Sequence, residues 1–225
     1  MRDYEEFPEN LSLNTLYYIG NPSGLTAAGF DKLHQLFLKD KYFFSVEKLL
    51  KGKERAVVLY GPRDLAKSCP ELSLVEIEDY LGENSDFLTP AEQNKKVNVN
   101  LVLSWLVEPK NNPKKLLHIE SGAMNFTLED DQKVFIQMVL MPIQKSGENV
   151  FQSTFRVMVS DPDAIKRIEL AKKVGAIFNT ATGLNKHEDS FPETKKYDSY
   201  KQRSLIPKEV AEFMLTQEEV ISFIS

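Results

Sequence analysis

The chain has 225 residues, of which 42% are hydrophobic and 27% charged, a composition typical of a globular protein with one large or two small domains. Its formal net charge of −5 argues against a dedicated nucleic-acid-binding protein, whose domain is usually basic, but leaves room for one basic face. The single cysteine, Cys69, excludes an intramolecular disulfide, and no apolar run is long enough to span a bilayer. We therefore expect a cytoplasmic protein without a membrane span.

The first part of the chain predicts elements in the order β-α-β-β-α-β, which is that of the split β-α-β unit of ferredoxin-like folds. Strands are expected over residues 15–19, 42–50, 56–60 and 72–80, and helices over residues 26–39 and 64–68. In the first helix, Phe30, Leu33 and Phe37 recur at helical spacing and predict one apolar face. His34 is interpreted as lying on the polar, solvated side of this helix.

A second series of elements in the same order is expected after a polar connection, residues 82–96. Strands are predicted over residues 97–103, 134–141 and 150–159, and helices over residues 114–128 and from residue 161 to about residue 180. Asp161 is the expected N-cap of the last helix, with Pro162 at its first position. Its predicted inner face consists of Ile168, Ala171, Val174, Gly175 and Phe178. A returning strand could lie between residues 186 and 203, where the composition is loop-like.

The predicted fold class is therefore α+β, with two ferredoxin-like units, mainly antiparallel sheets and a short C-terminal helix. The predicted units are residues 1–81, a connection at 82–96, a second unit at 97–203 and a tail with the helix at 204–225. Thr216 and Glu219 form a capping box at the start of this helix, and Leu215 and Val220 form a hydrophobic staple. Since so short a helix is marginal alone, we expect it either to dock on the body or to lead into further chain.

The sequence contains no catalytic or nucleotide-binding signature. Neither G-x-x-x-x-G-K-[ST] nor G-x-G-x-x-G occurs, and the histidines are too far apart in sequence to suggest a metal site. We therefore expect no cofactor and no metal, and leave enzymatic activity uncertain. Carboxylates are plentiful, and those at Glu76, Glu78 and Asp79 are interpreted as members of a charged, solvent-facing turn. Trp105 ends an alternating strand, which favours packing in the core or between the units.

Basic residues gather near the end of the second unit and are candidates for contact with nucleic acid or a protein partner. They are Lys166, Arg167, Lys172 and Lys173 on the outer face of the last long helix, and Lys195, Lys196 and Arg203 in the following loop. Tyr197 and Tyr200 interleave with the loop cations, as in single-strand binding surfaces. Acidic residues in the same loop dilute its charge, which favours a solvated or partner-facing loop.

A series of short motifs runs from residue 131 to residue 219. Its residues are Asp131, Ile136, Gln137, Pro142, Phe155, Arg156, Phe178, Asn179, Arg203, Leu215, Thr216 and Glu219. In order, they read as an acidic residue, a strand with Ile-Gln and Pro, a strand with Phe-Arg, a helix ending in Phe-Asn, an Arg, and a Leu-Thr-x-x-Glu helix start. This pattern resembles the N-terminal, pre-motor domain of conjugation and type IV secretion ATPases of the HerA/FtsK superfamily.

The resemblance covers residues 97–225 and implies an accessory domain that docks on neighbouring subunits, a motor domain or a membrane component of a secretion channel. It places the protein at the inner face of the membrane through its partners. The Walker motifs of the family's motor are missing, so the resemblance assigns no ATP hydrolysis to these residues. Two alternatives remain: a free-standing binding protein of a mobile element or phage that contacts DNA or protein, and a small ferredoxin-like enzyme.

Overall fold

The computed structural model describes residues 14–20, 27–40, 42–81, 100–106, 127–145, 147–182, 185–186, 200–203 and 214–224. The strands are β1 (Asn14–Ile19), β2 (Phe44–Lys51), β3 (Glu54–Pro62), β4 (Leu74–Ile77), β5 (Asn100–Leu106), β6 (Lys133–Lys145), β7 (Glu148–Ser160), β8 (Asn185–Lys186) and β9 (Met214–Thr216). The helices are α1 (Ala27–Asp40), α2 (Leu65–Ser68), α4 (Ala164–Thr182) and α6 (Gln217–Ile224), and a 3₁₀ turn spans Pro70–Leu72. The predicted connection 82–96 and most of the predicted helix 114–128 lie outside the described residues.

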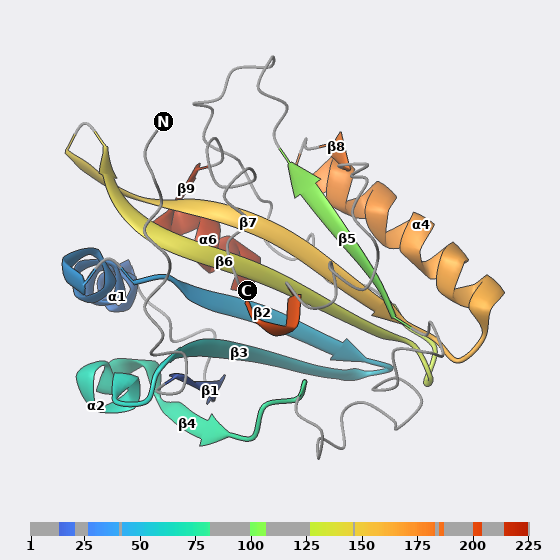
Figure 1. The fold of residues 1–225 in the computed structure, drawn as a ribbon, viewed down its shortest axis with the longest axis horizontal. Coiled ribbons are helices and arrows are strands. Elements are labelled where there is room, and N and C mark those ends of the chain that lie inside the picture. The colour runs from blue at the N-terminus through green and yellow to red at the C-terminus, as the bar shows by residue number, and fades with distance from the viewer. Residues whose placement is uncertain are drawn as a thin grey trace.

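All these strands belong to one sheet, whose order is β4-β1-β3-β2-β6-β7-β5-β8, with β9 beside β7 (Figure 1). Every pairing in it is antiparallel, which confirms the predicted α+β class with a mainly antiparallel sheet. The two series of elements meet in the middle, where β2 pairs with β6 from Phe44 opposite Leu140 to Lys51 opposite Lys133. Counted from its own first strand, each series has the strand order 4-1-3-2.

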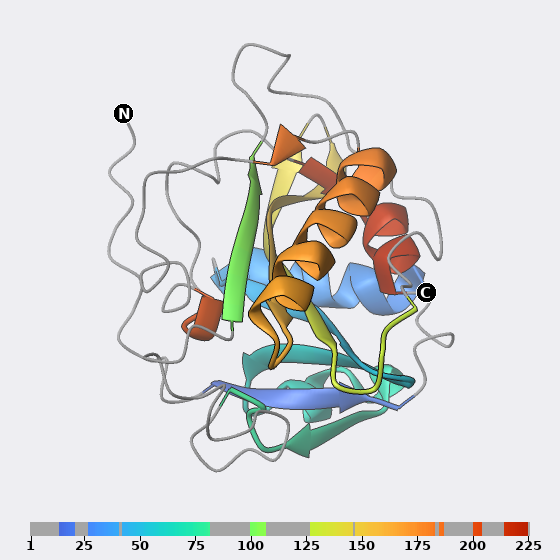
Figure 2. The same ribbon diagram turned by 90° about the vertical axis from the view of Figure 1, so that its right-hand side faces the viewer.

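The two faces of the sheet are covered differently. One face, here called the helix face, packs against α1, α2, α4 and α6 and forms the main apolar core. The opposite face, here called the far face, carries a smaller cluster that includes Leu49, Val58, Phe135 and Met158. Figure 2 shows α4 and α6 on one side of the sheet and the short segment 200–203 on the other.

Aromatic packing fixes the helices to the helix face. Phe37 of α1 stacks on Phe44 of β2, with ring centroids 4.7 Å apart. Phe155 of β7 contacts Phe178 of α4 and Phe223 of α6 edge-on, at 5.1 and 5.8 Å. The predicted apolar face of α1 is confirmed, because Phe30, Leu33 and Phe37 are all buried.

The β2–β3 turn depends on a glycine. Gly52 has a φ of 51°, in the left-handed region that side chains disfavour, and its amide donates a 3.0 Å hydrogen bond to the Gln132 carbonyl. A Cβ at this position would lie 3.2 Å from Asp130 Cα. The turn therefore approaches the backbone before β6 closely, next to the β2–β6 pairing.

The start of α4 differs from the prediction. Its capping side chain is Asp163, not Asp161, because Asp163 Oδ1 accepts hydrogen bonds from the amides of Ile165 at 2.7 Å and Lys166 at 3.1 Å. Asp161 instead accepts a 2.8 Å bond from the Asp163 amide and so holds the turn before the helix. Of the predicted inner face, Ala171, Val174, Gly175 and Phe178 are buried, which confirms them, whereas Ile168 is 52% exposed and Leu170 is buried instead.

The C-terminal helix begins as predicted. The Glu219 amide donates to Thr216 Oγ1 at 3.3 Å, and both residues of the predicted staple, Leu215 and Val220, are fully buried. Because Phe223 and Ile224 are also buried, α6 docks on the body of the protein.

Candidate functional site

A row of polar side chains crosses the centre of the far face. Glu47 of β2 lies directly opposite Gln137 of β6, which lies directly opposite Arg156 of β7. All three are fully buried, although strand alternation places them among apolar neighbours such as Phe135 and Met158. Gln137 joins the row, since it accepts a 3.1 Å bond from Arg156 Nη1 and donates a 3.2 Å bond to Glu47 Oε1. Buried polar groups of this kind require partners, and this row supplies them across three strands.

Arg203 completes the row from a distant part of the chain. Its Nε lies 2.7 Å from Glu47 Oε1, and its two terminal nitrogens bind both oxygens of Asp79, at 2.7 and 2.9 Å. The Arg203 side chain is only 2% exposed and that of Glu47 is fully buried, whereas that of Asp79 is 38% exposed. The guanidinium is thus held by two carboxylates in the paired, fork-like geometry that arginine favours.

Three tyrosines surround this ion pair. The Arg203 guanidinium carbon lies 4.4 Å from the centre of the Tyr60 ring and 5.6 Å from that of Tyr80, within the range of cation–π contacts. The Tyr80 hydroxyl donates to Glu47 Oε2 at 2.6 Å and lies 2.9 Å from the Tyr200 hydroxyl. We call Glu47, Asp79, Tyr60, Tyr80, Tyr200 and Arg203, with Gln137 and Arg156, the arginine cluster.

The charges in the cluster support one another. Burial opposes ionisation of Asp79, but the hydrogen bonds and charge of Arg203 outweigh it and hold the pKa of Asp79 below its usual value. Burial would likewise lower the pKa of Arg203, yet Glu47 and Asp79 raise it well above the ordinary value. Burial, reinforced by the charge of Glu47, raises the pKa of Tyr80 and Tyr200 well above 10. The cluster therefore keeps Arg203 charged and both tyrosines neutral.

The described segment 200–203 contacts the sheet through both side-chain and backbone groups. Arg203 itself has a φ of 52°, an unfavourable left-handed conformation for a residue with a Cβ, and its amide donates back to the Tyr200 carbonyl at 3.1 Å. Gln137 Nε2 donates to the same carbonyl at 3.0 Å. The Tyr200 and Arg203 side chains, both buried, are the groups that reach into the sheet.

The Glu47 carboxylate is fully used within the cluster. It accepts bonds from Arg203, Tyr80, Gln137 and, at 2.6 Å, the Ser45 hydroxyl. Within the described ranges, no group of three or more histidine, cysteine, aspartate or glutamate side chains could hold a metal ion.

The structure describes five of the seven predicted contact residues. Lys166, Arg167, Lys172 and Lys173 all belong to α4, whereas Lys195 and Lys196 lie outside the described residues. Arg203 is 1% exposed, so it is not available to a nucleic acid or partner at the surface as the sequence suggested. Its two carboxylate partners are distant in sequence, which is why the sequence does not predict its burial.

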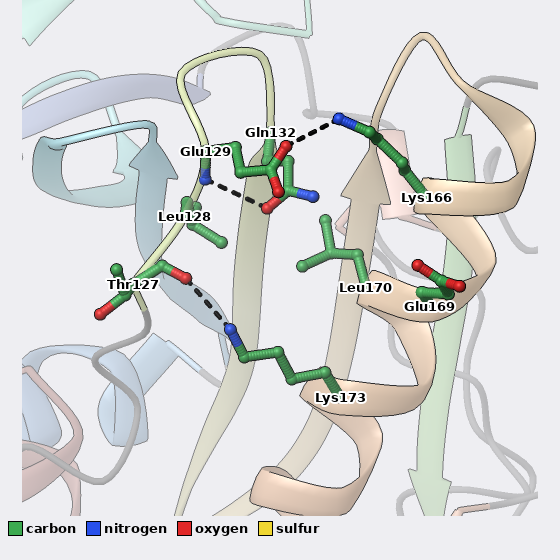
Figure 3. A pocket seen from close by; sticks show the side chains of 8 residues that line it. All are labelled: Thr127, Leu128, Glu129, Gln132, Lys166, Glu169, Leu170 and Lys173. Carbon is green, nitrogen blue, oxygen red and sulfur yellow. Dashed lines mark hydrogen bonds and ion pairs between the residues drawn. The ribbon is translucent and has the colours of Figure 1, made fainter.

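A cavity of about 560 Å³ opens between α4 and the segment before β6 (Figure 3). Its lining residues are Thr127, Leu128, Glu129, Gln132, Lys166, Glu169, Leu170 and Lys173. Lys166 Nζ forms a 2.9 Å ion pair with Glu129, and Lys173 Nζ donates to the Thr127 carbonyl at 3.3 Å. Two of the four helix cations therefore form contacts that run across this cavity, from α4 to the segment before β6.

Two further buried polar residues lie on the helix face. His34 is fully buried, contrary to its interpretation as solvated, and its Nε2 lies 3.0 Å from the Ile143 carbonyl and 3.1 Å from that of Val150. Lys48 Nζ donates to the Phe223 carbonyl at 3.3 Å, at the end of α6. Burial, with a smaller effect of Arg55, lowers the pKa of Lys48 to about 8.

The apolar residues on both sides of Glu47 in the sequence indicate that its carboxylate is buried. Residues 43–50 read FFSVEKLL, and a strand with apolar residues on both faces has no solvent for a carboxylate. Asp79 and Tyr80 give no comparable signal, because they follow β4 in a polar stretch.

A comparison with protein-family models, curated proteins and solved structures finds no match. None of the helices in the described ranges has the length and apolar character needed to cross a membrane.

Proposed function

We propose that this chain is a non-catalytic docking module, an accessory domain of a conjugation or type IV secretion ATPase. In this role it binds neighbouring subunits, the motor domain or a membrane component of the channel, at the cytoplasmic face of the membrane. The proposal includes the finer description of the fold as two ferredoxin-like units, which the 4-1-3-2 strand order of each half supports.

The observation that carries the proposal is the meeting of the motif residues. Gln137, Arg156 and Arg203, which belong to three separate motifs of the resemblance, lie in the arginine cluster within one network of hydrogen bonds. Phe178 of a fourth motif packs on Phe155. In this arrangement the motif residues stabilise the fold and do not form a reactive site. That is expected of a module that binds partners through its surface.

The outer side of α4 is the surface best suited to a protein partner. Ile165 is 70% exposed and Ile168 is 52% exposed, although large apolar side chains gain free energy when buried. They lie one turn apart beside exposed Lys172. Apolar residues ringed by charges are typical of a contact surface between proteins.

Contact with DNA through the same helix is the second candidate, and the exposure of Lys172 and Lys173 favours it. However, Lys166 is paired with Glu129, and Glu169 lies on the exposed side of the same helix. The exposed side of α4 therefore carries both positive and negative charges, which favours binding to a protein over binding to a phosphate backbone.

The proposal is tested by placing a photo-crosslinking amino acid at Ile168 in the intact protein in its source cells. The matched control places it at Glu54, which is exposed on the opposite half of the sheet. We expect an Ile168 adduct that mass spectrometry identifies as a P-loop ATPase or a component of a secretion channel. Equal labelling at both positions would refute the docking surface. A nuclease-sensitive adduct would favour the DNA alternative.

A further inference from the structure

We propose that the outer side of α4 binds the outer side of α4 in a second copy of this chain. The two helices lie antiparallel about a two-fold axis that passes beside residues 170 and 171. This inference rests on the docking role proposed for the helix and names its partner. In such a contact both copies use the same residues, so the surface has to be complementary to itself.

The outer side of α4 is a continuous exposed stripe. Its members recur at intervals of one, three and four residues, which places them on one side of a helix. We call them the α4 stripe: Ile165, Ile168, Glu169, Lys172 and Ala176. The opposite side of the helix packs on the sheet, and Figure 2 shows α4 in front of the strands, with its outer side turned away from them.

Antiparallel packing makes the α4 stripe complementary to itself in charge. A residue on one side of the two-fold axis faces the residue equally far beyond the axis in the other copy. Glu169 therefore lies opposite Lys172 of the second copy, and Lys172 lies opposite Glu169 of the second copy. The contact thus contains two ion pairs of opposite charge and no pair of like charges.

The same axis also matches the sizes of the apolar side chains. Ile165 faces Ala176 of the second copy, whose small side chain leaves room for the isoleucine, and this match occurs twice. Ile168 lies beside the methylene stem of Lys172 from the second copy, which covers it while the ammonium group stays in water. Ile165 and Ile168 are 70% and 52% exposed in the single chain, so both lose apolar exposed area in the contact.

The two charges that meet across the axis are not used within the described part of the chain. Neither Glu169 nor Lys172 forms an ion pair or a side-chain hydrogen bond with another described residue. The three other cations of α4 do contact groups of the same chain; they are Lys166, Arg167 and Lys173. The α4 stripe itself therefore carries one positive and one negative charge, and two copies can approach without net repulsion between their stripes.

The expected association is weak, because one helix from each copy buries less area than a standard protein interface. We expect a Kd of about 10–100 μM at low ionic strength. Added salt should weaken the association, since both ion pairs lie at the edge of the contact. Sedimentation equilibrium of the purified 225-residue chain measures both quantities. A wild-type protein that stays monomeric at about 1 mM would overturn the proposal.

The decisive test exchanges the two charges between separate variants. Glu169→Lys places lysine opposite lysine and Lys172→Glu places glutamate opposite glutamate, so each variant alone should associate at least tenfold more weakly than wild type. An equimolar mixture should form a heterodimer at least as strong as the wild-type dimer, because both ion pairs are then restored. Both positions are exposed, so both variants should fold, which circular dichroism checks.

Glu54→Lys is the matched control, because it makes the same change of charge at an exposed position of β3. It should associate as the wild type does, alone or mixed with Lys172→Glu. Single variants that associate like wild type, or a mixture that stays as weak as its components, would refute the antiparallel contact.

The position of the axis is tested with introduced cysteines, since the native Cys69 is buried. On oxidation, Ile165→Cys mixed with Ala176→Cys should give a mixed disulfide. Ile165→Cys alone should not link to itself, because its two copies lie about 16 Å apart along the helix axis. A disulfide of Ile165→Cys with itself that forms as fast as the mixed disulfide would contradict this axis.

The cellular crosslink from Ile168 separates this inference from the docking role. If the purified chain stays monomeric while the crosslink joins it to another protein, the second copy is excluded and the docking role stands. If the purified chain dimerises and the only cellular adduct is the chain itself, the second-copy contact stands without a further partner on α4.

Discussion

Arg203 and Glu47 are 156 residues apart in the chain, yet their side chains form a 2.7 Å ion pair in the interior of the protein. Glu47 is fixed in β2, near the middle of the sheet, and Arg203 reaches it from the segment 200–203. This pair ties a distant segment to the far face of the sheet.

Replacing Glu47 with glutamine should destabilise the protein by about 3 kcal/mol, because it leaves the Arg203 guanidinium buried with one charge partner fewer. The glutamine side chain would also place an NH₂ donor opposite groups that now donate hydrogen bonds to the Glu47 carboxylate. Urea unfolding followed by circular dichroism measures the change. Glu54→Gln, at an exposed position of β3, should remain within about 0.5 kcal/mol of wild type.

Tyr80→Phe should cost about 1–2 kcal/mol, since it removes the hydroxyl that bonds Glu47 and Tyr200 and leaves their oxygens short of a partner. Tyr18→Phe is the matched control, because Tyr18 is 38% exposed. The difference between the two free energies of unfolding is the quantity to compare. Equal losses would mean that the Tyr80 hydroxyl contributes no stability.

Asp79→Asn should be destabilising at neutral pH, and the effect should shrink in acid. The pKa of Asp79 is lower in the folded protein than in the unfolded chain, because Arg203 outweighs the effect of burial. Its stabilisation is therefore fully present above the unfolded pKa of about 4 and is lost as the pH falls through the folded pKa. Chemical denaturation of both proteins at several pH values between neutral and strongly acidic gives this difference. A difference that stays constant with pH would contradict the assignment.

The free energy of unfolding of the wild-type protein should increase as the pH rises above about 8, and Lys48→Met should remove this increase. The pKa of Lys48 is lowered to about 8 by burial, so between there and the ordinary value of about 10.4 the unfolded chain holds a proton that the folded protein has released. The wild type should gain about 2 kcal/mol relative to Lys48→Met between about pH 8 and 9.5. Lys53→Met, at an exposed turn position, should show the wild-type dependence.

Ile168→Ser should leave the free energy of unfolding within about 0.5 kcal/mol of wild type, because the side chain is 52% exposed. In the proposed docking role it should nevertheless reduce partner crosslinking from a probe at Ile165. Val75→Ser, which alters an exposed residue of β4, should leave that crosslink unchanged. A crosslink from Ile165 that is unchanged in Ile168→Ser would mean that the Ile168 side chain contributes nothing to the contact.

Local periodicity predicts much of the chain because it reports directly on which side of an element is buried. It locates β1, β2, β3, β6, β7, α1 and α4, and the bond from the Glu219 amide to Thr216 Oγ1 confirms Thr216 as the cap of α6. It does not predict that β2 pairs with β6, since the choice of a neighbouring strand depends on contacts across the whole sheet.

The polar interior escapes prediction because its partners are far apart in sequence. The basic neighbours of Arg203 in the sequence indicate a surface loop, and the acidic neighbours of Asp79 indicate a solvated turn. In the structure Arg203 is buried and Asp79 is partly buried, and the two side chains bind each other. His34 is the exception with a local signal: Phe30, Leu33, His34 and Phe37 follow the i, i+3, i+4, i+7 spacing of one helix face. The place of His34 in this helical spacing, and not the polarity of its side chain, predicts that it is buried.

The seam between β2 and β6 has a consequence for the folding of the chain. Two halves with the same strand order meet edge to edge, as two identical subunits do when they extend a common sheet across a two-fold axis. The described strands are thus arranged as in a two-fold symmetric dimer, although both halves belong to one polypeptide. Separating the halves would expose the long backbone edges of β2 and β6, so neither half is suited to an independent existence and the two should melt together.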